Sequence, residues 1–208
     1  MQIKMFSDTI CGWCYIGKER LNQAIEQLNL SQSIVMNLPF QLNPSMPKDG
    51  MDRIDYIKSK FGSIENAKPM YDNMIMQGEQ EDLEIKLDKI KVTPNTVKSH
   101  LLIDLSREQN KEHEVINELF HFYFTKAKDI GNEEVLINLG RKYGIEEKKI
   151  KDCFSSEINI KKINEMDVTA KKMGITGVPF FVFNDKNSLS GAQPVENLIE
   201  AIQQSSNG

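Results

Sequence analysis

The spacing of apolar residues changes twice within the first forty positions of the chain. Residues 1–5 alternate between apolar and polar types, which is the pattern of a strand. From Leu21 to Leu28, apolar residues recur at helical spacing with polar residues between them. Residues 34–38 are rich in strand formers and end at Pro39. The chain therefore begins with a predicted strand, helix and strand, a connection that normally crosses over right-handed between parallel strands.

A helical period dominates the middle of the chain, after a proline-punctuated loop at residues 40–50. Residues 54–61 predict one helix, and a less regular segment follows through residue 76. Thr93 and Pro94 have the residue types of an N-cap and a first helical position, so they predict the start of the next helix. Apolar stripes predict further helices up to residue 173, and the insertion is expected to be helical throughout.

Strand signals return at the C-terminal end. Residues 180–183 and 188–190 flank a polar turn and predict a β-hairpin, and Pro194 begins a last amphipathic helix. A chain of 208 residues is long for one ordinary domain and short for two, which fits a single core with a large insertion. The predicted order is βαβ, a helical insertion and then ββα, an α/β architecture.

Composition and charge narrow the partners and the location. Hydrophobic residues make up 39% of the chain, which fits a globular protein. Lys+Arg 26 against Asp+Glu 30 give a net charge of -4 without a basic block, so neither nucleic acid nor an anionic membrane is an expected partner. No stretch approaches the roughly 20 apolar residues of a membrane span, and residues 1–6 lack the pattern of a signal peptide. We therefore expect a cytoplasmic protein, in which a disulfide would be transient and catalytic.

The candidate chemistry lies in Cys11-Gly12-Trp13-Cys14, between the first strand and the first helix. Two cysteines at this spacing can face each other across the first helical turn, as a redox couple, half of a metal site or an incidental pair. Free cysteine has a pKa near ~8.5, and a helix N-terminus favours its thiolate. Cys11 is therefore the expected nucleophile, and Cys14, one turn inside, the expected resolving thiol. Trp13 would stand at the rim and hold an apolar partner segment.

A zinc site would need two further ligands beside the cysteine pair. The remaining candidates besides carboxylates show no paired spacing; they are Cys153, His100, His113 and His121. A CxxC between a strand and a helix favours redox chemistry, so we predict a redox-active disulfide and no bound metal. Cys153 lies among apolar helical residues and is expected to be a packed free thiol.

A second feature is the segment Gly174–Phe180, in which Pro179 comes directly before a predicted strand. A cis Val178–Pro179 bond would expose the Val178 backbone to an extended peptide near the cysteines. About 5–6% of X–Pro bonds in folded proteins are cis, and composition leaves both isomers open. His100 also has two interpretations, either a polar group facing the active-site cleft or a partly exposed histidine on a polar helix face.

Taken together, these features resemble the thioredoxin fold with a helical insertion, which is the plan of the DsbA-like oxidoreductases, and in particular their FrnE-type cytoplasmic branch. The resemblance covers nearly the whole chain. Its motifs, in chain order, are Ser7-Asp8, Cys11-Gly12-Trp13-Cys14-Tyr15-Ile16-Gly17, Phe40-Gln41-Leu42-Asn43-Pro44, Thr93-Pro94-Asn95-Thr96, Gly131, Gly174-Ile175-Thr176-Gly177-Val178-Pro179-Phe180-Phe181 and Ser190-Gly191-Ala192-Gln193-Pro194.

The resemblance implies a thioredoxin-fold unit made of residues 1–45 and 175–208, with residues 46–174 as the helical insertion. Together these segments would form one DsbA-like domain of about residues 1–204.

The resemblance also implies a redox centre at the cysteine pair, a cis Pro179 and a substrate groove lined by Val178. Gly12, Trp13 and His100 are further candidates for this groove. Gly12 departs from the branch, which commonly has proline there; glycine loosens the turn and leaves an extra backbone N–H that can contact sulfur.

The sequence therefore predicts an enzyme, a cytoplasmic thiol–disulfide oxidoreductase or isomerase, that needs no cofactor besides its own disulfide. Its expected partners are protein or peptide thiols and disulfides, together with glutathione or another small thiol, and it would act as a monomer or homodimer. One alternative is a glutathione-dependent isomerase or transferase of the 2-hydroxychromene-2-carboxylate isomerase type, which typically has serine at the position of Cys11. Another is a peptide-holding, chaperone-like module in which the thiols are incidental.

Overall fold

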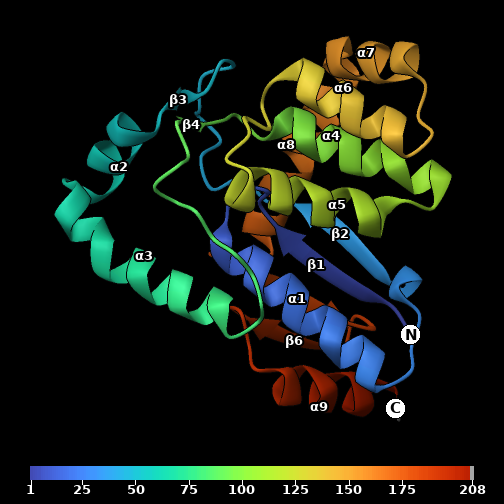
Figure 1. Cartoon of the computed structure of the whole chain (residues 1–208). Helices are drawn as coiled ribbons and strands as arrows, with labels where there is room; N and C mark the ends of the chain where they lie inside the picture. The colour runs from blue at the N-terminus through green and yellow to red at the C-terminus, as the bar shows by residue number, and fades with distance from the viewer. Residues whose placement is uncertain (207–208) are drawn as a thin grey trace.

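A four-stranded mixed sheet forms the centre of the molecule in the computed structural model, which describes residues 1–206 (Figure 1). Its strands are β1 (Ile3–Ser7), β2 (Val35–Pro39), β5 (Phe180–Phe183) and β6 (Asn187–Ser190), in the order β2-β1-β5-β6. β1 pairs with β2 in parallel and with β5 antiparallel, and β5 and β6 form an antiparallel hairpin. The predicted parallel βαβ unit and C-terminal hairpin are confirmed.

The alternation along the strands sends side chains to two covered faces. Ile3 and Met5 are fully buried on the face covered by α1 (Gly12–Gln27) and α9 (Val195–Ser206), which pack against each other (Figure 1). Phe6 points to the opposite face, where it packs with residues that include Ala170 of α8 (Glu157–Lys172). The sheet is therefore covered by helices on both faces, and the β1–α1 connection leads from the sheet to one of these layers.

The insertion is mostly helical and packs against α1 and the sheet edge. Its helices are α2 (Arg53–Phe61), α3 (Ile64–Glu79), α4 (Val97–Ser106), α5 (Glu112–Phe120) continued by the π-helical turn η3 (His121–Thr125), α6 (Glu133–Lys142), α7 (Glu147–Ser155) and α8, with the short 3-10 turn η2 (Arg107–Gln109). Another 3-10 turn, η1 (Gln32–Ile34), lies outside the insertion, directly before β2. Tyr15 of α1 stacks on Phe120 and Phe124, so α5 and η3 are anchored to the thioredoxin-like core. Among residues 1–206, no helix has the length and apolar character needed to cross a membrane.

The insertion departs from the sequence prediction at Thr93 and Pro94, which do not begin a helix. Thr93 belongs to β4 (Val92–Thr93), which pairs with β3 (Met51–Asp52) in a short antiparallel ribbon. The Thr93 hydroxyl accepts a hydrogen bond from the Arg53 guanidinium, so its polar group has a partner other than a helix end. Helix α4 starts four residues later at Val97, whose N–H is held by the Asn95 side chain. The expectation of an all-helical insertion is therefore wrong at this ribbon.

The segment that the pattern indicated as less regular forms the 16-residue helix α3. The Ser63 hydroxyl caps it by accepting from the Asn66 N–H. Its buried residues are Ala67, Met74 and Gly78, which lie on one face. Because this face is narrow and two of its members are small, the helical period is weak in the sequence.

The predicted division of the chain into a thioredoxin-fold unit and an insertion stays a prediction. The central sheet, α1 and α9 come from residues 1–45 and 175–206, and residues 46–174 supply α2 to α8 and the β3–β4 ribbon. Residues 207 and 208 of the predicted C-terminal part lie outside the described residues.

Candidate active site

The two cysteines of the CxxC motif lie at the beginning of α1, directly after β1. Cys11 is the N-cap residue, with extended backbone, and its carbonyl accepts the N–H of Cys14 at 2.9 Å. Cys11 is 7% exposed and Cys14 is fully buried, and both are free thiols. The pair is therefore asymmetric, because only Cys11 reaches the surface.

The loop before β5 brings Val178 and Pro179 to the Cys11 thiol. The Val178–Pro179 peptide bond is cis, and the Cys11 thiol donates a hydrogen bond to the Val178 carbonyl at 3.6 Å. Pro179 also packs on α1 at Gly17, where an added Cβ would come within 2.7 Å of the Pro179 Cγ. A larger residue at position 17 would push the proline away, so Gly17 permits the close approach of loop and helix.

The surroundings of Cys14 favour its protonated form. Burial raises the pKa of Cys14 well above its ordinary value, and the hydrogen bond with Cys11 and the charges of Cys11 and Asp8 raise it further. A hydrogen bond with the Asp8 backbone acts in the opposite direction on the same pKa. Cys14 is consequently a poor nucleophile until a base accepts its proton.

Gly12 has a structural reason that the sequence pattern did not reveal. An added Cβ at this position would lie 2.2 Å from the Sδ atom of Met74, which comes from α3 of the insertion. Met74 is buried and belongs to the same apolar cluster as Cys11 and Cys14. The glycine therefore makes room for a thioether beside the first turn of α1, and a proline ring would occupy the same space.

Trp13 is partly exposed and packs against the main core, as expected for a residue at the rim of the site. His100 lies elsewhere, because its side chain is 3% exposed and its Nε2 is 3.6 Å from the Asp8 Oδ1. His100 thus lies behind Asp8 and does not line an open groove. The polar and exposed helix face that the sequence allowed for it does not occur.

Buried hydroxyls fix α4 against the β1–α1 connection. The Thr9 and Ser99 hydroxyls are 2.8 Å apart, and Ser99 also donates to the Thr96 carbonyl. Both the Thr9 and the Ser99 side chains are fully buried. The three consecutive polar residues Ser7-Asp8-Thr9, between a buried strand and a buried cysteine, were the signal in the sequence that could have indicated this contact.

Arg20 of α1 links this helix to the C-terminal end of α3 and to the loop after β6. The Arg20 guanidinium binds Glu81 at 2.5 Å, Gln77 at 2.8 Å and the Ala192 carbonyl at 2.7 Å.

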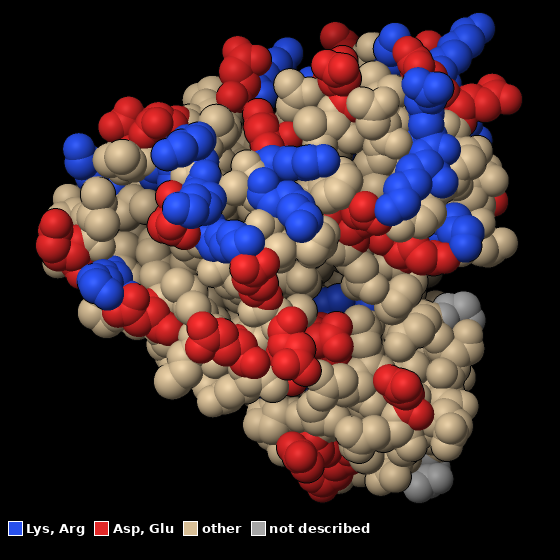
Figure 2. Space-filling model, viewed as in Figure 1, with Lys and Arg blue, Asp and Glu red and all other residues tan. Residues whose placement is uncertain are grey.

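Figure 2 shows acidic side chains gathered over α1 and the end of α3, while lysines and arginines lie mostly over the upper helical part. The face of the molecule that contains the α1–α3 junction is therefore not uniformly basic.

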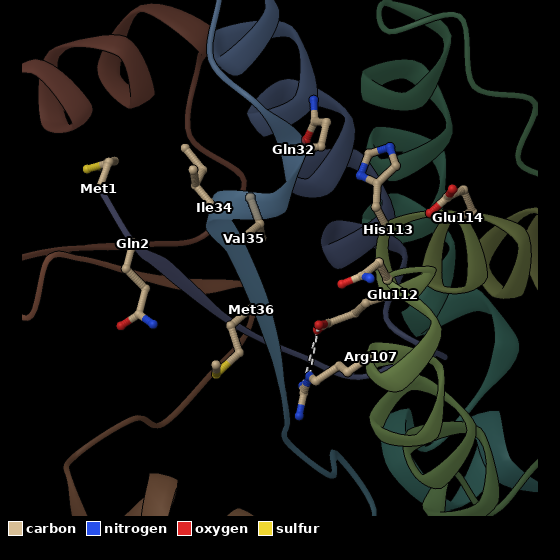
Figure 3. Close-up of a pocket in the computed structure, with 11 residues that line it drawn as sticks. Met1, Gln2, Gln32, Ile34, Val35, Met36, Arg107, Glu112, His113 and Glu114 are labelled. Carbon is tan, nitrogen blue, oxygen red and sulfur yellow. Dashed lines mark hydrogen bonds and ion pairs between the residues drawn. The ribbon is translucent and has the colours of Figure 1, made fainter.

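A separate cavity of about 470 Å³ lies at the β2 edge, between η1 and the start of α5 (Figure 3). Figure 3 shows the Arg107 side chain paired with Glu112 on its wall, and the two are 2.8 Å apart. None of the predicted site residues lines this cavity. In residues 1–206, no group of three or more His, Cys, Asp or Glu side chains is arranged to hold a metal ion.

Several solved structures share this fold. A probable DsbA oxidoreductase from Streptomyces coelicolor is 25% identical, with a TM-score of 0.86 over 100% of this chain and 90% of the other. A 2-hydroxychromene-2-carboxylate isomerase is 12% identical, with a TM-score of 0.76 over 100% and 97% of the two chains. The cytosolic disulfide reductase DsbM from Pseudomonas aeruginosa with GSH is 15% identical, with a TM-score of 0.66 over 100% of both chains.

The family model of the DSBA-like thioredoxin domain matches residues 2–203, which is nearly the full length. This match agrees with the sheet order β2-β1-β5-β6, the CxxC motif at the start of α1 and the proline loop beside it. The chain therefore belongs to the DSBA-like thioredoxin family, with the thioredoxin fold and helical insertion of that family.

Proposed function

We propose that this protein is a cytoplasmic thiol–disulfide oxidoreductase of the FrnE type, which exchanges disulfides with protein or peptide substrates through Cys11 and Cys14. The observation that carries the proposal is the position of the Cys11 sulfur, at the N-cap of α1 and 3.6 Å from the Val178 carbonyl. A helix N-terminus stabilises a thiolate, and the buried Cys14 one turn away can reach the same sulfur.

The exchange proceeds in two displacements. The Cys11 thiolate attacks a substrate disulfide, forms a mixed disulfide and releases one substrate sulfur as a thiolate. Cys14 then gives up its proton and attacks the Cys11 sulfur, so that the Cys11–Cys14 disulfide forms and the second substrate sulfur leaves. Two electrons pass from the protein dithiol to the substrate, and the same steps in reverse oxidise a substrate dithiol.

The groove for an extended substrate lies, in this proposal, between the Pro179 loop and the rim at Trp13. Val178 would offer backbone groups to the peptide next to the reacting sulfur, and Trp13 would cover apolar side chains. Gly12 and Met74 would form the floor beside the mixed disulfide, since the Met74 thioether fills the space next to the Gly12 Cα. Glutathione, a short thiol peptide, fits the same chemistry as a partner.

Turnover of insulin disulfides with a thiol reductant tests the proposal. We expect Cys11→Ser to abolish turnover and Cys14→Ser to accumulate mixed disulfides that mass spectrometry detects. Cys153→Ser is the matched control and should turn over like the wild type, because Cys153 lies outside the site. Insulin reduction by Cys11→Ser at the wild-type rate would refute the proposal.

A redox titration with reduced and oxidised glutathione decides the direction of exchange. A midpoint near about −120 to −180 mV would mark an oxidant or isomerase, and one near about −270 mV a reductant. If no Cys11–Cys14 disulfide forms at any ratio while glutathione binds the reduced protein, the glutathione-dependent isomerase class would replace this proposal. If the protein suppresses aggregation of other proteins, and does so equally well with Cys11→Ser and Cys14→Ser combined, peptide holding is an additional activity of the groove.

A further inference from the structure

Strand β2 lies at the edge of the central sheet, so one side of its backbone has no neighbouring strand. The protein covers part of this edge itself. The Asn37 N–H donates to a Glu112 carboxylate oxygen at 2.5 Å, and the Asn37 carbonyl accepts from the Arg107 guanidinium. Asn37 therefore directs both of its backbone groups away from β1, and two side chains occupy the positions that another strand would take.

Val35 presents the uncovered part of the same edge. Because backbone groups alternate along a strand, the Val35 N–H and carbonyl point to the same side as those of Asn37, two residues later. No side chain that the structure describes binds these two groups, and Val35 lines the cavity of about 470 Å³ at the β2 edge. Unpaired backbone groups of this kind are a template for pairing with another chain.

The cavity wall on the α5 side of this edge is acidic. It contains the carboxylates of Glu112 and Glu114, and its guanidinium, from Arg107, is already paired with Glu112. Glu114 forms only a partly exposed ion pair with Lys111, which a cation of a ligand can replace. Burial lowers the pKa of His113 to about 4, so this side chain on the wall is neutral at pH 7. The α5 side therefore favours a basic group.

The other side of the edge is apolar, because Met36 borders a second cavity as well as the first. Figure 3 shows Met36 on one side of the β2 ribbon and Glu112 and Glu114 on the other. The second cavity has a volume of about 420 Å³ and lies between the sheet and α8. Its apolar lining includes Phe6, Leu38, Met166 and Val182.

We propose that an extended segment of a partner protein binds this edge as a fifth strand, antiparallel to β2, with a basic residue opposite Val35 and an apolar residue on either side of it. Directly opposite residues of an antiparallel pair exchange both N–H···O=C bonds, so one residue satisfies both Val35 groups. This site contains no cysteine, so the inference goes beyond disulfide exchange.

The charge and the pleat of the edge determine this order of side chains. Opposite residues of a strand pair share a face of the sheet, and Val35 shares its face with Asn37. The Asn37 side-chain amide also donates to Glu112, so this face is the one next to α5. A residue opposite Val35 therefore faces the acidic wall, and its neighbours face Met36 and the apolar cavity.

NMR of the full-length protein with the peptide acetyl-Thr-Val-Lys-Val-Thr-amide tests the proposal. We expect saturable binding that slows hydrogen exchange of the Val35 amide and leaves the Met36 amide, which points to β1, unchanged. N-methylation of the peptide lysine removes the donor to the Val35 carbonyl. This change should weaken binding on the order of tenfold, whereas N-methylation of the following valine, whose N–H points to solvent, should change it by less than about twofold.

Charge reversal tests the acidic wall. Glu114→Lys should weaken binding of the lysine peptide on the order of fivefold and strengthen binding of acetyl-Thr-Val-Glu-Val-Thr-amide. Glu134→Lys is the matched control, because Glu134 also lies in the first turn of a helix, α6, but outside the cavity. Its affinity for both peptides should stay within about twofold of the wild type.

Three results overturn the proposal. They are an unchanged exchange rate of the Val35 amide at millimolar peptide, equal affinities of the two methylated peptides, and the same preference for the lysine peptide in Glu114→Lys as in the wild type. Light scattering identifies the other possible occupant. If the Val35 amide is protected without peptide in a dimer, a second copy of the chain covers the edge and the peptide site is wrong.

Discussion

The contact between Gly12 and Met74 predicts that position 12 can change only if position 74 changes with it. A Cβ at residue 12 would lie 2.2 Å from the Met74 Sδ, whereas non-bonded contacts of this kind normally begin near about 3.5 Å. Gly12→Ala therefore forces Met74 or the first turn of α1 to move by roughly 1 Å. Overpacking of this kind costs about 1–3 kcal/mol, and the better helix propensity of alanine offsets up to about 1 kcal/mol.

Met74→Ala alone should destabilise the protein by about 2–5 kcal/mol, because Met74 is buried and its loss leaves a cavity beside the cysteines. In the double variant the methyl group added at position 12 occupies part of that cavity. We therefore expect the double variant to be more stable than the sum of the single effects by about 1–3 kcal/mol. Urea unfolding at constant m-value measures the three differences in the free energy of unfolding.

Gly177→Ala is the control for this cycle. Gly177 also lies near the active site, but an added Cβ there has no heavy atom within 4 Å. Its unfolding free energy should stay within about 0.5 kcal/mol of the wild type, and it should not couple to Met74→Ala. If Gly12→Ala and Met74→Ala are additive within about 0.5 kcal/mol, the thioether is not the reason for glycine at position 12.

Three further predictions concern Lys18 and Gly17 of α1 and Cys153 of α7. Burial lowers the pKa of Lys18 from 10.5 to about 7. Between these two pH values the unfolded chain binds a proton that the folded chain does not, so the free energy of unfolding decreases as the pH falls from about 10.5 to about 7. Lys18→Met should abolish this slope and be neutral or stabilising at pH 7, by at most about 5 kcal/mol. Urea unfolding at several pH values tests this prediction, and a retained slope contradicts it. Gly17→Ala should displace Pro179 and slow insulin reduction on the order of tenfold, and an unchanged rate would show that the loop tolerates the shift. Cys153→Ala should keep the rate of insulin reduction within about twofold of the wild type, because burial raises the pKa of this thiol and its sulfur contacts Asn159. A larger loss of rate would show that Cys153 takes part in the reaction.

Local patterns predicted the helices and strands well where an element has a clear row of buried apolar residues. The alternation in β1 and the apolar run at residues 180–183 were sufficient to place two strands of the central sheet. The parallel pairing of β1 with β2 followed from the βαβ order. Thr93 was assigned wrongly because its real partner, Met51, is distant in sequence. A cap-and-proline signal describes only the adjacent residues, so it could not reveal a strand pair.

The same distinction applies to the site. The CxxC spacing identified Cys11 and Cys14, since both members belong to one helical turn. By contrast, the contacts of Gly12 with Met74 and of Asp8 with His100 join segments that only the tertiary packing brings together. Glycine at position 12 was visible in the sequence as a departure from the related branch, but its cause was not.

The insertion contributes to the surroundings of the two sulfurs, in addition to the CxxC motif itself. Helix α3 places Met74 against the first turn beside Cys11, and helix α4 places His100 behind the aspartate that acts on Cys14. The dipeptide between the cysteines therefore cannot be the only determinant of redox behaviour in this protein. Changing Gly12 to the proline of related sequences would alter the Met74 contact at the same time, so its effect on the potential reports on helix α3 as well as on the motif.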